Sequence, residues 1–144
     1  MVWSNRIRVI FADDGALMRH LFRETFETNP NLDIVGYAKS AKEAIDLIRV
    51  RSPHLILIDE CLLGMTGHEI IKEIREHHDE IAIVGVVSST DQGRAEGVEM
   101  IVQGANSFVE KPPTTGHAAN AIQKFEEAIL PELIAWGEQV KYTS

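Results

Sequence analysis

Short apolar runs alternate with helical patterns along most of the chain. The runs predict strands over Ile7–Ala12, Leu32–Tyr37, His54–Ile58, Ile81–Val87 and Ser107–Glu110. Several of them are near-continuous stretches of Val, Ile and Leu, which suit strands that are buried on both faces. The pattern therefore favours a parallel sheet covered on both sides.

Between and after these runs, apolar residues recur at the three- and four-residue spacing of amphipathic helices. The expected buried positions are, helix by helix, Leu17, Leu21, Phe22 and Phe26; Ala41, Ala44, Ile45 and Ile48; Ile70, Ile71 and Ile74; Ala95, Val98, Ile101 and Val102; and Ala118, Ala121, Ile122, Phe125, Ala128 and Ile129. Five successive strand–helix units imply right-handed crossovers. We therefore expect an α/β fold, a five-stranded doubly wound parallel sheet with five flanking helices.

The end of the chain has a different character. Pro131 lacks an amide hydrogen, so it is expected to kink or end the last helix. We interpret residues 1–130 as one domain and residues 131–144 as a C-terminal extension, either a helical continuation or a tail. Three apolar residues of the extension either pack back on the last helix or form a contact with a second copy or another partner: Leu133, Ile134 and Trp136.

Composition narrows the class of protein. A length of 144 residues is that of one ordinary domain, and the net charge of −8 argues against a nucleic-acid partner. The single cysteine, Cys61, cannot form an internal disulfide, which fits a reducing compartment. No apolar segment has the length of a membrane span, and the first residues lack the apolar core of a signal peptide. We expect a cytoplasmic domain.

Charged side chains follow the predicted strands. Asp13 and Asp14 follow the first strand and Asp59 follows the third, at the edge where parallel α/β sheets bind ligands. Such an oxygen-rich set suits Mg²⁺ or Mn²⁺, although the first two acids could simply cap a helix. Ser88 and Lys111 follow the fourth and fifth strands and add a hydroxyl and a cation. Together these groups indicate phosphoryl-transfer chemistry.

The same segments resemble the receiver domains of bacterial two-component response regulators. The matching motifs are Ile10-Phe11-Ala12-Asp13-Asp14, Leu57-Ile58-Asp59, Val86-Val87-Ser88-Ser89 and Phe108-Val109-Glu110-Lys111-Pro112. They cover about residues 6–130 and stand in the family's order. Within the family the chain looks closest to the receiver of the chemotaxis methylesterase, on the further stretches Gly15-Ala16-Leu17-Met18-Arg19 and Asn29-Pro30-Asn31-Leu32-Asp33-Ile34-Val35-Gly36. The resemblance implies a flavodoxin-like topology.

The resemblance also implies an acceptor and a metal site. Asp59 would accept a phosphoryl group from a sensor histidine kinase or a phosphotransfer protein. Asp14 and Asp59 would bind Mg²⁺ directly, and Asp13 would do so directly or through water. The backbone carbonyl of Cys61 would be a further ligand.

The resemblance implies that other residues stabilise the phosphoryl group and respond to its presence. Lys111 would pair with the acceptor, and a cis peptide bond between Lys111 and Pro112 would hold the lysine in position. Ser88 would hydrogen-bond to the phosphoryl group, and Phe108 occupies the place of an aromatic switch. Signalling would pass through the face of the fourth helix, fifth strand and fifth helix to a downstream target or to an effector domain outside this sequence. The chain would thus be a signalling phosphoacceptor rather than an enzyme with a separate substrate.

The loop after the acceptor departs from the family pattern. Leu63 stands where the family usually has proline, and Thr66 stands where it often has aspartate. Loss of the proline would leave the loop less constrained in φ. The strongest alternative is therefore a degenerate receiver that acts as a phosphorylation-independent interaction module.

Two further alternatives share parts of the pattern. A flavodoxin-like FMN carrier needs a phosphate-cradling loop after the first strand, where the acidic pair would repel phosphate. An aspartate-nucleophile phosphatase needs a second acid two residues after the nucleophile, where this chain has Cys61. Neither fits the residues as well as a receiver does.

Overall fold

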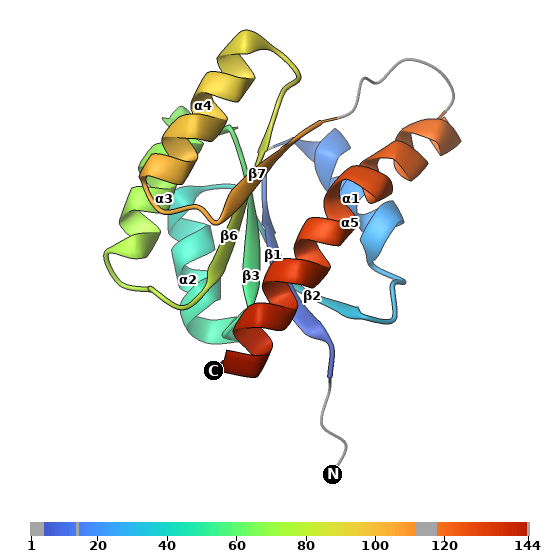
Figure 1. The fold of residues 1–144 in the computed structure, drawn as a ribbon, viewed down its shortest axis with the longest axis horizontal. Helices are drawn as coiled ribbons and strands as arrows, with labels where there is room; N and C mark the ends of the chain where they lie inside the picture. Colours follow the sequence, from blue (N-terminus) through green and yellow to red (C-terminus); the bar gives the residue numbers. More distant parts are fainter. Residues whose placement is uncertain (1–4, 14, 112–117, 144) are drawn as a thin grey trace.

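The computed structural model describes residues 5–13, 15–111 and 118–143. Five parallel strands form one sheet in the order β2-β1-β3-β6-β7 (Figure 1). Their bounds are β1 Ile7–Ala12, β2 Leu32–Ala38, β3 Leu55–Asp59, β6 Ala82–Val87 and β7 Ser107–Glu110. The predicted parallel sheet is confirmed, with strand ends that differ from the expected ones by at most one residue.

Helices cover both faces of this sheet. Their bounds are α1 Ala16–Phe26, α2 Ala41–Arg51, α3 Gly67–Arg75, α4 Asp91–Val102 and α5 Ala118–Thr143. Helices α1 and α5 lie on one face, and α2, α3 and α4 lie on the other (Figure 1). The doubly wound α/β fold with five flanking helices is therefore confirmed for the described part of the chain.

Each face has its own hydrophobic core. Under α1 and α5 the core is rich in aromatic rings, and the rings of Phe11 and Phe22 stack with centroids 4.0 Å apart. Under α2, α3 and α4 it is mainly aliphatic, built from residues such as Ile56, Ile71 and Ile83. Burial of these strands on both faces explains why their sequences read as continuous apolar runs.

The strand order reverses at β1, which lies between β2 and β3. Ala12 of β1 is in register with Ile58 of β3, so Asp13 and Asp59 follow at adjacent positions on the same edge of the sheet. Ligands of open α/β sheets bind at such a reversal, beyond the carboxyl ends of the strands. The topology therefore gathers the predicted acidic residues at one place.

The predicted buried face of α4 was wrong. Val98, Ile101 and Val102 are 55%, 42% and 68% exposed, and α4 instead buries Gly93, Gly97 and Met100 against the sheet. Glycines add nothing to a hydrophobic pattern, so the helix approaches the sheet through a face that the pattern does not mark. Leu17, at the start of α1, is likewise exposed rather than buried.

Helix α5 does not end at Pro131 but continues to Thr143. Ile129 and Leu133, on either side of the proline, are both fully buried in the core under α1 and α5. Full burial of a leucine or isoleucine side chain is worth roughly 1.5–3 kcal/mol, comparable with the roughly 3 kcal/mol cost of a proline inside a helix. Packing thus offsets the hydrogen bond that the proline removes.

A small hairpin that the sequence did not predict follows β3. Its strands are β4 Cys61–Leu62 and β5 Met65–Thr66, and Leu63 and Gly64 form its turn with φ of 47° and 84°. Thr66 then caps α3, because its side chain accepts a hydrogen bond from the backbone N–H of Glu69. Within the described residues, no helix has the length and hydrophobicity that crossing a membrane requires.

Candidate functional site

Asp59 and Lys111 meet at the carboxyl edge of the sheet. Asp59 is the last residue of β3 and is 8% exposed, and Lys111 directly follows β7. The ammonium nitrogen of Lys111 lies 2.7 Å from Oδ1 of Asp59. The structure therefore brings together this lysine and this acid, which the sequence predicts at the ends of two different strands.

Asp13 supplies a second buried carboxylate, beside the first. It is 2% exposed, and its Oδ1 accepts a hydrogen bond of 2.6 Å from the backbone N–H of Gly15. Asp14, the third predicted acid, lies outside the described residues. Two of the three expected carboxylates are thus placed on neighbouring strands.

The surroundings of the Asp59 carboxylate disfavour its ionised form. Burial raises the pKa of Asp59 above its ordinary value, and the nearby Glu60 charge adds to this, although Lys111 acts in the opposite direction. The folded protein therefore binds this proton more tightly than the unfolded chain does. The contribution of Asp59 to stability falls as the pH rises from the ordinary carboxyl value through the raised pKa. At neutral pH the site favours a cationic ligand.

The two serines after β6 have different contacts. Ser89 donates a hydrogen bond of 2.6 Å from its hydroxyl to the carbonyl oxygen of Lys111, and the Lys111 N–H donates to the Val87 carbonyl at 2.7 Å. These bonds fix the backbone that carries the lysine. Pro112 lies outside the described residues, so the cis peptide bond expected between Lys111 and Pro112 stays a prediction.

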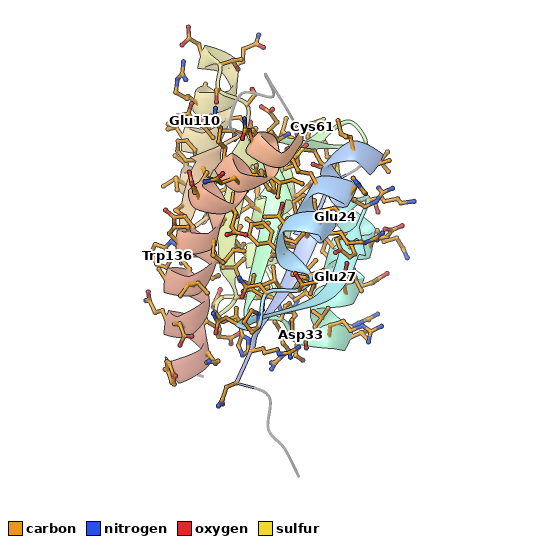
Figure 2. All side chains as sticks on the ribbon, turned by 90° about the vertical axis from the view of Figure 1, so that its right-hand side faces the viewer. Glu24, Glu27, Asp33, Cys61, Glu110 and Trp136 are labelled. Atoms are coloured by element: carbon orange, nitrogen blue, oxygen red, sulfur yellow. The ribbon has the colours of Figure 1, made fainter. Side chains whose placement is uncertain are left out.

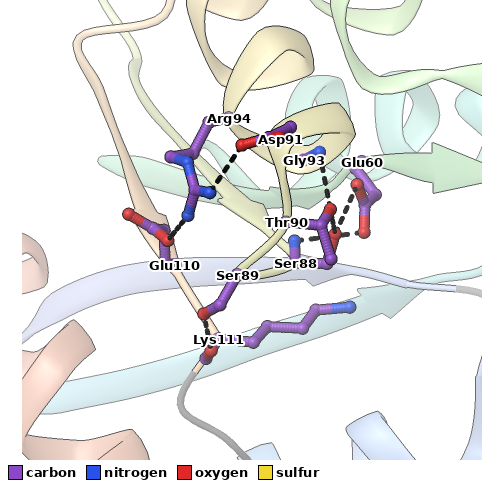
Figure 3. A network of polar contacts seen from close by, with 9 residues as sticks. All are labelled: Glu60, Ser88, Ser89, Thr90, Asp91, Gly93, Arg94, Glu110 and Lys111. Atoms are coloured by element: carbon purple, nitrogen blue, oxygen red, sulfur yellow. Dashed lines mark hydrogen bonds and ion pairs between the residues drawn. The ribbon is translucent and has the colours of Figure 1, made fainter.

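Ser88, the predicted phosphoryl ligand, is bound to Glu60 (Figure 3). The Ser88 N–H donates to Glu60 Oε1 at 3.1 Å, and the Ser88 hydroxyl lies 3.4 Å from Oε2 and 2.8 Å from the hydroxyl of Thr90. Sequence reasoning missed Glu60. A fourth acid directly after Asp59 was the signal that could have found it.

Cys61 and Phe108 are the remaining predicted site residues. Cys61 begins β4 beside the acidic edge, and its side chain is exposed. Figure 2 shows Cys61 and Glu110 at the same end of the molecule, with Asp33 toward the opposite end. Phe108, in β7, is half-buried, and its ring packs so close to Gly97 that a Cβ there would lie 2.5 Å from Cδ2. The aromatic ring therefore lies against α4.

The donor chemistry fits a hard divalent cation. Two buried carboxylates on neighbouring strands are the oxygen ligands that Mg²⁺ or Mn²⁺ prefers. Among the described residues, which exclude Asp14, no cluster of three or more His, Cys, Asp or Glu side chains is arranged to hold a metal. The residues present are compatible with a magnesium site that the third acid completes.

Fold and site together define a class of protein. It is a doubly wound α/β domain with a buried aspartate paired with a lysine at the carboxyl edge of the sheet, where the strand order reverses. The sequence profile of the response regulator receiver domain matches residues 9–123 of this chain. The chain belongs to the response regulator receiver domain family of two-component signalling. The resemblance expected from the motifs is confirmed.

Curated relatives include bacterial methylesterases. The chain is 32% identical over 131 residues to protein-glutamate methylesterase/protein-glutamine glutaminase 2 of Carboxydothermus hydrogenoformans, and 25% identical over 127 residues to the corresponding protein of Nocardioides. These alignments cover 91% and 88% of this chain but only 36% and 35% of the relatives. The chain therefore spans about a third of the length of the curated relatives it matches.

Solved structures agree with this assignment. The response regulator domain of Thermotoga maritima CheB matches with a TM-score of 0.74 and 27% identity, covering 95% of this chain and 97% of that one. The receiver domain of a LuxO-like repressor from Vibrio parahaemolyticus also has a TM-score of 0.74, at 19% identity over 96% of this chain and 95% of that one. The second match shows the fold alone. The flavodoxin-like receiver topology is confirmed.

Proposed function

We propose that Asp59 accepts a phosphoryl group from a phosphohistidine of a sensor kinase or a phosphotransfer protein. The observation that carries the proposal is the buried Asp59 carboxylate with the Lys111 ammonium 2.7 Å away. A buried acid at the ligand-binding edge of the sheet, beside a cation that can neutralise incoming oxygens, is suited to phosphoryl transfer.

The chemical step forms an acyl phosphate. An oxygen of the Asp59 carboxylate attacks phosphorus, the bond between phosphorus and the donor imidazole nitrogen breaks, and that nitrogen keeps the electron pair. Lys111 stabilises the negative charge of the transferring group, because its ammonium already lies at the carboxylate. Ser88 would then donate to a phosphoryl oxygen.

A divalent cation would complete the site. Asp13, Asp14 and Asp59 would hold Mg²⁺ through their carboxylates, and Cys61 through its backbone carbonyl; Mn²⁺ would suit the same ligands. When bound, the metal neutralises charge on the phosphoryl oxygens. The burial of Asp13 and Asp59 supports this role, since a cation stabilises the ionised form of a buried acid.

Phosphorylation would be read out as a shift between two arrangements. The new group adds about −1.5 to −2 units of charge next to the acidic edge. Ser88 would move toward it, and Phe108 would leave its place against α4. The face of α4, β7 and α5 would change shape for a downstream target or an effector domain. A homodimer linked to phosphorylation is also part of the proposal, and light scattering with and without beryllofluoride tests it.

The names of the relatives describe proteins that are much longer than this chain. Methylesterase and glutaminase are the names of relatives about three times as long as the matched part. We propose for this chain the phosphoacceptor role in the cytoplasm, where the exposed thiol of Cys61 stays reduced. Phosphotransfer assays against a panel of sensor kinases would identify its phosphoryl donor.

The test compares Asp59→Asn with the unchanged protein in acetyl phosphate and Mg²⁺. Intact-mass spectrometry should show one added phosphoryl group on the unchanged protein and none on D59N. Asp33→Asn is the matched control, because Asp33 is the second residue of β2 and lies toward the opposite end of the molecule from Cys61 and Glu110. Equal incorporation in D59N would overturn the acceptor assignment. Failure of the unchanged protein to bind beryllofluoride with Mg²⁺ would favour the degenerate interaction module instead.

A further inference from the structure

The Glu60 side chain reaches from the end of β3 to the loop after β6 and engages Ser88 twice (Figure 3). Its Oε1 accepts from the Ser88 N–H at 3.1 Å, and its Oε2 lies 3.4 Å from the Ser88 hydroxyl. The Glu60 backbone is fixed as well, because its carbonyl accepts from the Gly67 N–H at 2.8 Å. A carboxylate held in place therefore contacts both donors of the predicted switch residue.

This contact continues into helix α4. The Thr90 hydroxyl accepts a hydrogen bond of 2.9 Å from the Gly93 N–H and lies 2.8 Å from the Ser88 hydroxyl. All these contacts are satisfied together only if Thr90 donates to Ser88 and Ser88 donates to Glu60, since the carboxylate can only accept. Hydrogen bonds running in one direction strengthen one another. Glu60 is thus the terminal acceptor of a chain that begins at the α4 N-terminus.

We propose that Glu60 is a positioning residue. Its carboxylate holds Ser88 until a phosphoryl group on Asp59 takes over as the hydrogen-bond acceptor for Ser88. The inference rests on the proposed phosphoacceptor function. A carboxylate and a phosphoryl group are both anionic acceptors, so they compete for the same serine hydroxyl. Phosphorylation of Asp59 also places new negative charge one residue away from Glu60. Binding at Asp59 must therefore break the Glu60–Ser88 bonds.

Two variants separate charge from hydrogen bonding. Glu60→Gln removes the charge and keeps one acceptor oxygen for Ser88, whereas Glu60→Ala removes both. Glu69→Gln is the matched control, because Glu69 is an exposed acid at the start of α3 that contacts Thr66 rather than Ser88. All three are compared with the unchanged protein by calorimetric titration with beryllofluoride at saturating Mg²⁺.

Removal of the competing carboxylate should tighten binding. We expect E60A to bind beryllofluoride about tenfold more tightly, the factor that one net hydrogen bond to a charged group supplies, with E60Q intermediate and E69Q within about twofold of the unchanged protein. Equal affinities for E60A, E60Q and the unchanged protein would overturn the proposal, and so would weaker binding by E60A. Loss of binding in the unchanged protein would instead contradict the acceptor function itself.

A second measurement needs no phosphoryl mimic. In the ligand-free protein the Ser88 amide hydrogen should exchange about tenfold faster in E60A than in the unchanged protein, because its acceptor is gone. The Gly93 amide, two links further along the chain of hydrogen bonds, should change in the same direction by less. Unchanged exchange at Ser88 would show that Glu60 does not hold this residue, whatever the outcome at Asp59.

Discussion

Asp59 is held between opposing influences that define what the site can bind. Burial raises its pKa, while the Lys111 ammonium at 2.7 Å favours the ionised form. Asp13, Asp59 and Glu60 lie at the same edge of the sheet, where Lys111 pairs with Asp59 among the described residues. Under the proposed function, a metal ion would add the positive charge that a phosphoryl dianion needs beside these acids.

The backbone conformation of Leu63 is incompatible with the proline that the family usually has at this position. Its φ is 47°, in the left-handed region that a proline ring cannot adopt. Leu63→Pro restores the family residue but should destabilise the protein by about 1–3 kcal/mol in urea unfolding. The same change should weaken Mg²⁺ binding, because Cys61, whose backbone carbonyl is a proposed metal ligand, lies in the same hairpin.

Leu63→Gly is the control for this prediction. Glycine adopts positive φ without strain, and the leucine side chain is 67% exposed, so the fold should lose little packing. Stability should be equal or higher by up to about 1 kcal/mol. A proline variant as stable as the unchanged protein would show that the turn can adopt the family's conformation.

Helix α4 is tied to the rest of the protein by polar links at three places. Its N-cap Thr90 contacts Ser88, and Arg94 pairs at 2.9 Å with Glu110, the last residue of β7. Glu96 accepts from both the backbone N–H and the ring Nδ1 of His68, at the start of α3. The first link leads through Ser88 to Glu60, next to Asp59, and the second leads to β7. Under the proposed function, phosphorylation of Asp59 would therefore reach the helix through Ser88 and Thr90.

Gly97 controls how closely α4 approaches β7. A Cβ at this position would lie 2.5 Å from the ring of Phe108, so Gly97→Ala should push the ring or the helix away. Alanine gains about 1 kcal/mol in helix propensity, but overpacking costs about 1–3 kcal/mol, and we expect a net loss of stability in urea unfolding.

A double-mutant cycle with Phe108→Ala identifies the cause of that loss. If the clash is with the aromatic ring, G97A should become neutral or stabilising once the ring is absent, with a coupling of about 1–2 kcal/mol. Additive losses would mean that Gly97 acts through another contact. The cycle also shows whether the ring lies against α4 in solution.

The sequence predicts the strands better than it predicts the buried face of α4 or the side-chain contacts of the site. Continuous apolar runs marked the strands, because parallel strands buried on both faces have no polar side. The charged residues that follow the strands then pointed to Asp59 and Lys111, which the structure brings within 2.7 Å of each other. The buried face of α4 was missed because Gly93 and Gly97 carry no hydrophobic side chain, although they make its closest contacts. The Glu60–Ser88 contact depends on tertiary placement, which no local pattern records.

The whole molecule combines two cores on one sheet, and α5 extends along the aromatic one. Beyond Pro131, Leu133 is fully buried, and the Trp136 ring nitrogen donates to Glu132, whose carboxylate also accepts from Ser107 of β7 (Figure 2). These contacts join residues 131–143 to the sheet. We expect this part of the helix to belong to the same folding unit, and the division after residue 130 stays a prediction until it is tested.

Leu133→Ala makes that test. Deleting a fully buried leucine side chain from a packed core costs about 2–5 kcal/mol, so the variant should unfold in a single transition at clearly lower urea concentration. Tyr142→Ala, at a 78% exposed position near the helix end, should change the free energy of unfolding by less than about 0.5 kcal/mol. A loss below about 1 kcal/mol for L133A, or a separate early transition, would show that the last part of α5 folds independently. A large cooperative loss would place it within the receiver core, because only a residue packed in the cooperative unit can destabilise all of it.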